Sequence, residues 1–266
     1  MVLGVLGSKV AIKISPPNAA IPIRMFLFIS VNYIRIIVHF LSFWLYTPFM
    51  PKEYKTFGGH GVDVAEHRAD DLDKLCLERL SQLHCPSVLD LGCGAGGQSV
   101  RMAHVAAKVL CVDEYDFSQT FTEHAKELPV ADIDFQFVQS DLEQWIKSTD
   151  RSFNCVLFQR TIHYLPYLSA LKVLQKLSLL TTDSLFISVT GLHSAVGNEY
   201  VGRETRIESR FFTLTPKSAK TFSITQPVCL YTKAEFKQLL EQGGWEVEKL
   251  WESAFGNSKA VCRPRV

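Results

Sequence analysis

The stretch VLDLGCGAGG, residues 88–97, combines the residue types of a ligand-binding turn. An apolar run containing the acid Asp90 is followed by glycines at Gly92, Gly94, Gly96 and Gly97. Glycine lets the backbone take positive φ and lets a ligand approach the main chain closely. If a helix follows, its first N–H groups and its dipole favour a polar or anionic ligand. The pattern predicts a strand, a tight turn and a bound ligand, but it does not choose the ligand.

Polar residues also end the next apolar runs. Asp113 and Glu114 end AKVLCVDE, Asp141 and Leu142 follow IDFQFVQS, and Gln159 ends FNCVLFQ. In a parallel sheet, ligands bind outside the carboxyl ends of the strands. We therefore expect these residues to converge on one crevice.

Three nucleotide-like ligands compete for this turn. A phosphate-binding loop is excluded because no G-K-[ST] follows the glycines. Dinucleotide binding stays open, since Gly92, Gly94 and Gly97 fit G-x-G-x-x-G and Asp113 stands where an acid would bind ribose hydroxyls. Asp90 favours a positively charged ligand, because a pyrophosphate would add negative charge beside it. S-adenosylmethionine carries both a sulfonium and an ammonium group.

VLDLGCGAGG, VLCVDEY and VQSDLEQW are similar, in order and spacing, to the motifs of class I S-adenosylmethionine-dependent methyltransferases. The resemblance covers residues 61–263. It implies S-adenosylmethionine as cofactor, with its methionine part facing Gly92, Cys93 and Gly94, and Asp90 ordering the turn. Asp113 would bind the ribose, and Asp141 with Leu142 the adenine. The implied cofactor site comprises Asp90, Gly92, Cys93, Gly94, Gly96, Asp113, Glu114, Asp141, Leu142 and Gln159.

The sequence after the fourth strand bears on the methyl acceptor. The D/N-P-P-Y motif of nucleic-acid amino-methyltransferases is absent, and QRTIHYLPY resembles the small-molecule branch of the family. The resemblance places Gln159 and Arg160 near the sulfonium and the acceptor. Asn154 departs from the family pattern, because the fourth strand of these enzymes often begins with an aspartate. We expect a small organic acceptor and no nucleic acid; a nicotinamide-dependent oxidoreductase and a non-catalytic binding module are the alternatives.

Three residues are candidates for acid–base or acceptor contacts. His163 follows the fourth strand, and the ordinary pKa of histidine suits a general base at neutral pH. Tyr164 adjoins it, and His60 in FGGHG could cover the site as part of a lid. Packing within the core, or exposure in a solvated loop, is the alternative for each.

Residues 191–231 are too long for a simple connection, and such segments are usually functional or disordered. Within them, Arg203, Arg206 and Arg210 recur at helical spacing. They predict either a solvated helix with i,i+4 ion pairs or an arginine face that binds an anionic acceptor.

The elements that must position these residues alternate along the chain. Strands are predicted at 87–91, 107–113, 133–141, 153–159 and 184–190, with helices at 63–83, 98–107, 117–128, 142–147 and 165–180. A T-x-x-E capping box opens a helix at 232–242, and a β-hairpin follows at 245–265. We expect an α/β, Rossmann-like, doubly wound and mostly parallel seven-stranded sheet with a C-terminal β-hairpin and helices on both faces.

Composition changes near residue 50, because residues 1–52 contain no acid. We expect an N-terminal segment at 1–50 and a methyltransferase domain at 51–266 with a substrate-side insertion at 191–231. Residues 25–46 are long enough to cross a bilayer, although Asn32, Arg35 and His39 lie among them. A membrane anchor, a targeting segment and a later start at Met25 or Met50 are the alternatives.

The overall charge and the cysteines limit partners and compartment. A formal net charge of +1 argues against a broadly basic surface for nucleic acid. The seven cysteines are scattered without a C-x-x-C pair, so we predict neither a metal site nor a disulfide framework. A cytoplasmic setting for the catalytic domain fits this pattern.

Overall fold

The fold is given by a computed structural model that describes residues 2–6, 9–13, 28–30, 55–65, 69–128 and 133–265. Contacts divide the chain into two units, Met1–Glu53 and Tyr54–Val266. In the first, β2 (Lys9–Lys13) pairs antiparallel with β1 (Val2–Leu6) and with β3 (Phe28–Ser30). The candidate membrane segment at 25–46 lies outside the described residues except for β3. No helix within the described ranges is long and apolar enough to cross a bilayer.

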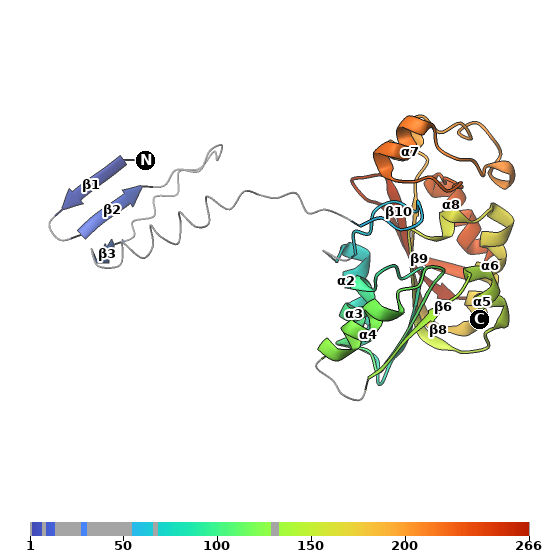
Figure 1. The fold of residues 1–266 in the computed structure, drawn as a ribbon, viewed down its shortest axis with the longest axis horizontal. Coiled ribbons are helices and arrows are strands. Elements are labelled where there is room, and N and C mark those ends of the chain that lie inside the picture. The colour runs from blue at the N-terminus through green and yellow to red at the C-terminus, as the bar shows by residue number, and fades with distance from the viewer. Residues whose placement is uncertain are drawn as a thin grey trace. The chain divides into compact units, whose positions relative to one another are not determined.

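In the second unit, the described residues form one seven-stranded sheet in the order β6-β5-β4-β7-β8-β10-β9 (Figure 1). Strand β10 runs antiparallel to both of its neighbours, and the other pairs are parallel. The fold predicted from the sequence is confirmed. The strands are β4 (Ser87–Leu91), β5 (Lys108–Asp113), β6 (Asp134–Gln139), β7 (Phe153–Gln159), β8 (Thr181–Thr190), β9 (Trp245–Glu252) and β10 (Asn257–Pro264).

Helices cover both faces of this sheet (Figure 1). One face carries α2 (Asp71–Ser81), α3 (Gly97–Ala103) and α4 (Ser118–Glu127), and the other carries α5 (Leu142–Ser148), α6 (Tyr167–Leu180) and α8 (Lys233–Gln242). Along β4, Val88 packs with the first group and Leu89 with the second. Because both of their faces are buried, the central strands β4, β5, β7 and β8 contain nearly continuous apolar runs, unlike the edge strands β6 and β9.

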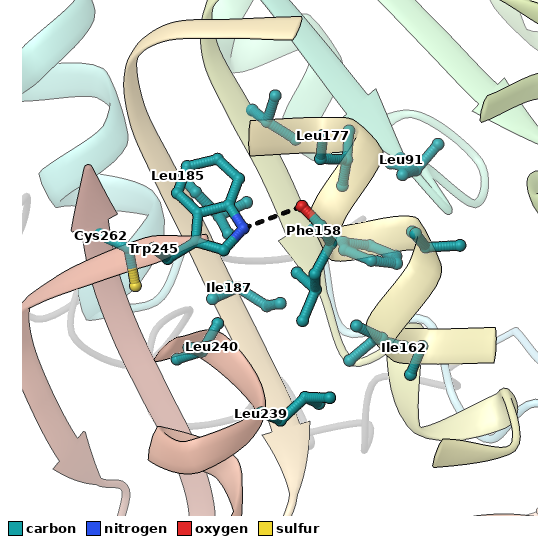
Figure 2. Packing of buried hydrophobic residues seen from close by; sticks show 14 of the residues in the cluster. Leu91, Phe158, Ile162, Leu177, Leu185, Ile187, Leu239, Leu240, Trp245 and Cys262 are labelled. Carbon is teal, nitrogen blue, oxygen red and sulfur yellow. Dashed lines mark hydrogen bonds between the residues drawn. The ribbon is translucent and has the colours of Figure 1, made fainter. Parts of the chain in front are cut away.

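The second face has a dense core around Trp245. Its indole Nε1 donates a hydrogen bond of 3.1 Å to the backbone carbonyl of Leu174 on α6, as Figure 2 shows. Leu239 and Leu240 of α8 and Ile187 of β8 belong to the same cluster. This core packs α6 and α8 against β8 and the C-terminal hairpin.

The prediction for residues 63–83 is wrong at its start. Helix α2 begins at Asp71, because Asp70 is its N-cap and forms a capping box with Asp73. Residues 55–65, which we call the cover segment, are a separate piece of chain. They bond to a distant part of the sequence: Gly61 N donates to Ser223 O at 2.9 Å, and Thr225 N to Gly59 O at 2.8 Å.

The insertion at 191–231 is packed around a small core of its own. Leu192, Tyr200, Leu214, Ile224, Val228 and Leu230 are all buried in it. The expected arginine helix is wrong, since among residues 203–210 only Ile207–Ser209 form a single 3₁₀ turn. Instead α7 (Pro216–Phe222) follows, capped by Thr215 with proline at its first position.

Candidate functional site

A cavity opens at the carboxyl ends of the strands where the strand order reverses. The chain runs outward from β4 through β5 to β6 and returns to β7 on the other side of β4, which is the switch point where such sheets bind ligands. The cavity encloses about 580 Å³, a size typical of small-molecule sites. Its wall contains these residues proposed from the sequence: His60, Asp90, Gly92, Cys93, Gly94, Asp113, Glu114, Asp141, Leu142, Gln159, Arg160 and Tyr164.

The glycine turn approaches two other segments closely. Gly92 has φ of 71°, and a Cβ added there would lie 2.3 Å from Thr161 Oγ1, so the segment that follows β7 is in direct contact with the turn. Gly96, which was predicted to belong to the site, does not line the cavity. A Cβ on Gly96 would lie 2.6 Å from the ring of Phe121. Its glycine is therefore explained by the packing of α3 against α4.

Three backbone N–H groups of the turn are already occupied. Gly92 N donates to Val112 O at 2.8 Å, Gly94 N to Asp113 Oδ2 at 2.9 Å, and Ala95 N to Asp63 Oδ2 at 3.2 Å. A dinucleotide would need such donors for its pyrophosphate. These donors are therefore not available to a pyrophosphate, and the carboxylates of Asp63 and Asp113 lie beside them instead.

Six carboxyl groups line the same cavity: Asp63, Asp73, Asp90, Asp113, Glu114 and Asp141. Asp90 accepts a hydrogen bond of 2.6 Å from Ser99 Oγ, and burial raises its pKa to about 7. Burial, with Asp70 nearby, raises the pKa of Asp73 to about 6. Such a concentration of carboxyl groups fits a ligand that carries positive charge.

Asp63 and Asp73 were not predicted as site residues. Asp73 is at the N3 position of α2 and forms the capping box with the N-cap Asp70. The sequence D-D-L-D at 70–73 could therefore have indicated the start of the helix, but not that Asp73 lies at the cavity. Asp63 lies in the cover segment, and its contact with the glycine turn is tertiary. No local pattern in the sequence encodes either placement.

Asp113 and Asp141 both hold backbone groups as well as lining the cavity. Asp113 Oδ1 accepts from Tyr115 N at 3.0 Å, and burial raises its pKa. Asp141 is exposed and caps α5 by accepting from Gln144 N at 2.8 Å. Capping uses one oxygen of Asp141, so its other oxygen can still contact a ligand.

His60 lies in the cavity wall, whereas His163 does not. His60 Nδ1 is 3.5 Å from Glu114 Oε1, and its ring packs edge-on against Tyr164 with centroids 4.4 Å apart. His163 is only 1% exposed, with Nε2 3.3 Å from Thr190 Oγ1. Burial lowers its pKa to about 3, so it is neutral and lies behind the wall. The structure does not favour the predicted general base.

Of the three arginines proposed for the site, only one lines the cavity. Arg203 donates to the carbonyls of Leu192 and Gly197 within the insertion, Arg206 is exposed, and neither lines the cavity. Arg160 does line it. Its φ of 50° is unusual for a residue other than glycine, and its backbone N is held by Ser188 O at 2.9 Å.

Comparison with known proteins gives a family match over part of the chain and solved structures with the same fold. Residues 88–182 match the family model described as a methyltransferase domain. No curated protein sequence matches the chain. Among solved structures, the 1,6-didemethyltoxoflavin-N1-methyltransferase of Burkholderia thailandensis, with bound 1,6-didemethyltoxoflavin and S-adenosylhomocysteine, aligns with a TM-score of 0.56 at 13% identity. The alignment covers 99% of this chain and 98% of that one.

Two further structures share the fold. A protein from Pyrococcus horikoshii aligns with a TM-score of 0.54 at 18% identity, over 73% of this chain and 88% of that one. An S-adenosylmethionine-dependent methyltransferase from Clostridium acetobutylicum aligns with a TM-score of 0.52 at 10% identity, over 88% of this chain and all of that one (100%). At these identities the likeness establishes the fold.

Proposed function

We propose that this chain, which carries a class I S-adenosylmethionine-dependent methyltransferase domain, transfers the methyl group to a small organic acceptor with an anionic group. The observation that carries the proposal is the glycine turn. The N–H groups of Gly94 and Ala95 are bonded to carboxylates, and further carboxyl groups surround the cavity beside the turn. Such a site suits a cationic nucleoside and is unsuited to a pyrophosphate.

Different residues would bind different parts of the cofactor. Gly92, Cys93 and Gly94 face its methionine part, and Asp113 binds the ribose hydroxyls. Asp141 and Leu142 hold the adenine through one polar and one apolar contact. In support of this division, all these residues line one cavity although they come from three different strand ends.

The remaining wall would receive the acceptor. It includes Tyr164, Leu165, Phe211 and Pro227, which offer mainly apolar and aromatic surface. Arg160 adds a positive charge, and no ion pair within the described ranges involves its guanidinium. A planar guanidinium in an apolar wall suits a carboxylate or phosphate, so Arg160 takes the role first expected of Arg203 and Arg206.

When bound, the cofactor supplies a methyl group activated by a positively charged sulfur. The protein then mainly has to align the acceptor and exclude water. The cover segment performs the second task through its hydrogen bonds to residues 223 and 225. His60, with Glu114 at its Nδ1, is placed to take a proton from an acceptor O–H or N–H.

Calorimetry tests the cofactor half of this proposal. We expect S-adenosylhomocysteine to bind the purified chain and NADH not to bind. Methyl-labelled S-adenosylmethionine, incubated with pairs of aromatic acids and their neutral amides, tests the acceptor half. Label should enter the acids. Binding of NADH without S-adenosylhomocysteine would overturn the methyltransferase proposal, and labelling of amides alone would overturn the anionic acceptor.

A further inference from the structure

Two side chains from distant elements meet at the edge of the cavity. The Gln159 amide nitrogen, at the end of β7, donates a hydrogen bond to Oδ1 of Asp73 on α2. Asp73 is only 3% exposed, whereas Gln159 is half-buried, and both line the cavity. Gln159 was expected at the site from the sequence, but its partner was not.

This bond fixes which end of the Gln159 amide is free. An ionised carboxylate can only accept hydrogen bonds, so the amide nitrogen must face Asp73 and the carbonyl oxygen must face away from it. The other Asp73 oxygen accepts from Asp70 N at 2.8 Å in the capping box. The carboxylate therefore cannot turn without breaking the start of α2.

Gln159 is the last residue of β7, close to the glycine turn. Thr161, two residues later, would clash with any Cβ on Gly92. The charged groups around Asp73 are Asp70 on its own helix, Asp90 on β4, Arg101 on α3 and Arg160 after β7. The Arg101 guanidinium lies 3.9 Å from Asp73 Oδ2.

We infer that Asp73 is a positioning residue that holds the carbonyl oxygen of Gln159 towards the cavity, where this oxygen favours the positively charged part of the bound ligand. The inference rests on the proposed function, because S-adenosylmethionine offers two such parts, its sulfonium and its ammonium. A carbonyl oxygen attracts a cation without the cost of burying another charge. Its attraction adds to that of the nearby carboxylates.

Protonation of Asp73 reverses this arrangement. A protonated carboxyl group donates, so the amide of Gln159 turns and presents its N–H₂ group to the cavity. Burial places the pKa of Asp73 at about 6. Affinity for the cationic ligand should therefore rise as pH increases through about 6, because the accepting orientation needs ionised Asp73.

The test compares three ligands by calorimetry: S-adenosylmethionine, S-adenosylhomocysteine, which lacks the sulfonium charge, and 5′-methylthioadenosine, which lacks both charged parts. Asp73→Asn keeps an oxygen for Asp70 N and turns a nitrogen towards Gln159, which mimics the protonated state. Gln159→Leu removes the oxygen altogether. Asp134→Asn, an exposed acid outside the cavity, is the matched control.

At pH 8 both variants should lose about tenfold affinity for the charged ligands and keep that for 5′-methylthioadenosine. The change near pH 6 should disappear in Asp73→Asn, which leaves only the change near pH 7 from Asp90, and both should persist in Asp134→Asn. Loss for S-adenosylmethionine alone would identify the sulfonium, and loss for both larger ligands the ammonium.

Two results would overturn the inference alone: unchanged affinities in both variants, or an equal loss for 5′-methylthioadenosine. Failure of the unmodified protein to bind any of the three ligands would instead overturn the proposed function. If Asp73→Asn does not fold, the affinities of Gln159→Leu for the three ligands still decide the question.

Discussion

Asp113 accepts a hydrogen bond of 2.9 Å from the backbone N–H of Gly94, nineteen positions earlier in the chain. The acid that ends β5 therefore holds the glycine turn that follows β4. One side chain both shapes the turn and lines the cavity next to it. Loss of this carboxylate should disturb binding in two ways, through the turn and through the lost contact.

Asp113→Ala should weaken binding of S-adenosylhomocysteine by more than about tenfold, since hydrogen bonds to charged groups contribute about 1.5–3 kcal/mol each. Calorimetry measures the change. Asp150→Ala is the control, because the Asp150 side chain is 94% exposed and lies outside the cavity. Equal affinity in the two variants would contradict the role given to Asp113.

Arg160→Gln should lower kcat/KM for anionic acceptors by about tenfold and leave neutral acceptors unaffected, because only the charged contact is lost. Arg206→Gln provides a matched control with an exposed arginine outside the cavity. Steady-state rates on paired acids and amides make the comparison. A uniform loss across both acceptor types would argue for a structural role of Arg160.

The two histidines should behave differently when replaced by glutamine. His60→Gln should slow transfer to acceptors that must lose a proton and flatten the pH–rate profile, because His60 faces the cavity. His163→Gln should leave that profile unchanged and lower the free energy of unfolding by about 1 kcal/mol, since it disturbs a buried contact with Thr190. The opposite pattern would restore His163 as the base.

Asp90 should make the ligand-free protein less stable as pH rises. Its folded-state pKa of about 7 lies above the unfolded value of about 4. The contribution of Asp90 is therefore fully present below about pH 4 and lost as pH rises through about 7. Asp90→Asn should raise the melting temperature at pH 8 and flatten its pH dependence. Melting curves at pH 5 and pH 8 measure this, with Asp134→Asn showing the unmodified slope.

Arg210 should be essential for the stability of the insertion. Its buried guanidinium donates to Leu230 O at 3.0 Å and contacts Glu235 Oε2 at 2.8 Å, which ties the insertion to the start of α8. Arg210→Met should cost about 3–5 kcal/mol, because Glu235 loses its partner. Urea denaturation compares it with Arg206→Met, for which we expect less than about 0.5 kcal/mol.

Much of the fold follows from the sequence because its signals are local. The apolar run 153–159 coincides with β7, and the T-x-x-E box at Thr232 opens α8 as predicted. A parallel sheet buried on both faces leaves little ambiguity about its strands. The number of strands then follows from the alternation of strands and helices together with the final hairpin, whereas the position of β10 between β8 and β9 does not.

The insertion could not be predicted in the same way. Its arginines recur at helical spacing, but Arg203 and Arg210 are held by backbone carbonyls in an irregular chain. Spacing alone does not distinguish an exposed helix face from side chains that bind loops. Helix α7 did carry a local signal, since Thr215 followed by Pro216 is a good helix start.

The acids of the site were predictable where they end strands, as Asp113 does, and not where they reach the cavity from elsewhere. Asp73 belongs to a helix that precedes the sheet, and Asp63 to the cover segment. His60 and His163 show the same limit, because only the tertiary structure decides which one faces the cavity.

The contact between Gln226 Nε2 and Gly58 O, 2.9 Å long, joins positions 168 residues apart. During synthesis, the glycine turn therefore leaves the ribosome long before residues 223–226, to which the cover segment bonds. Until residues 223–226 are synthesised, the glycine turn and the neighbouring strand ends are present, but the cover segment lacks the partners that hold it over the cavity. Shielding of a reactive methyl donor is thus reserved for the finished molecule.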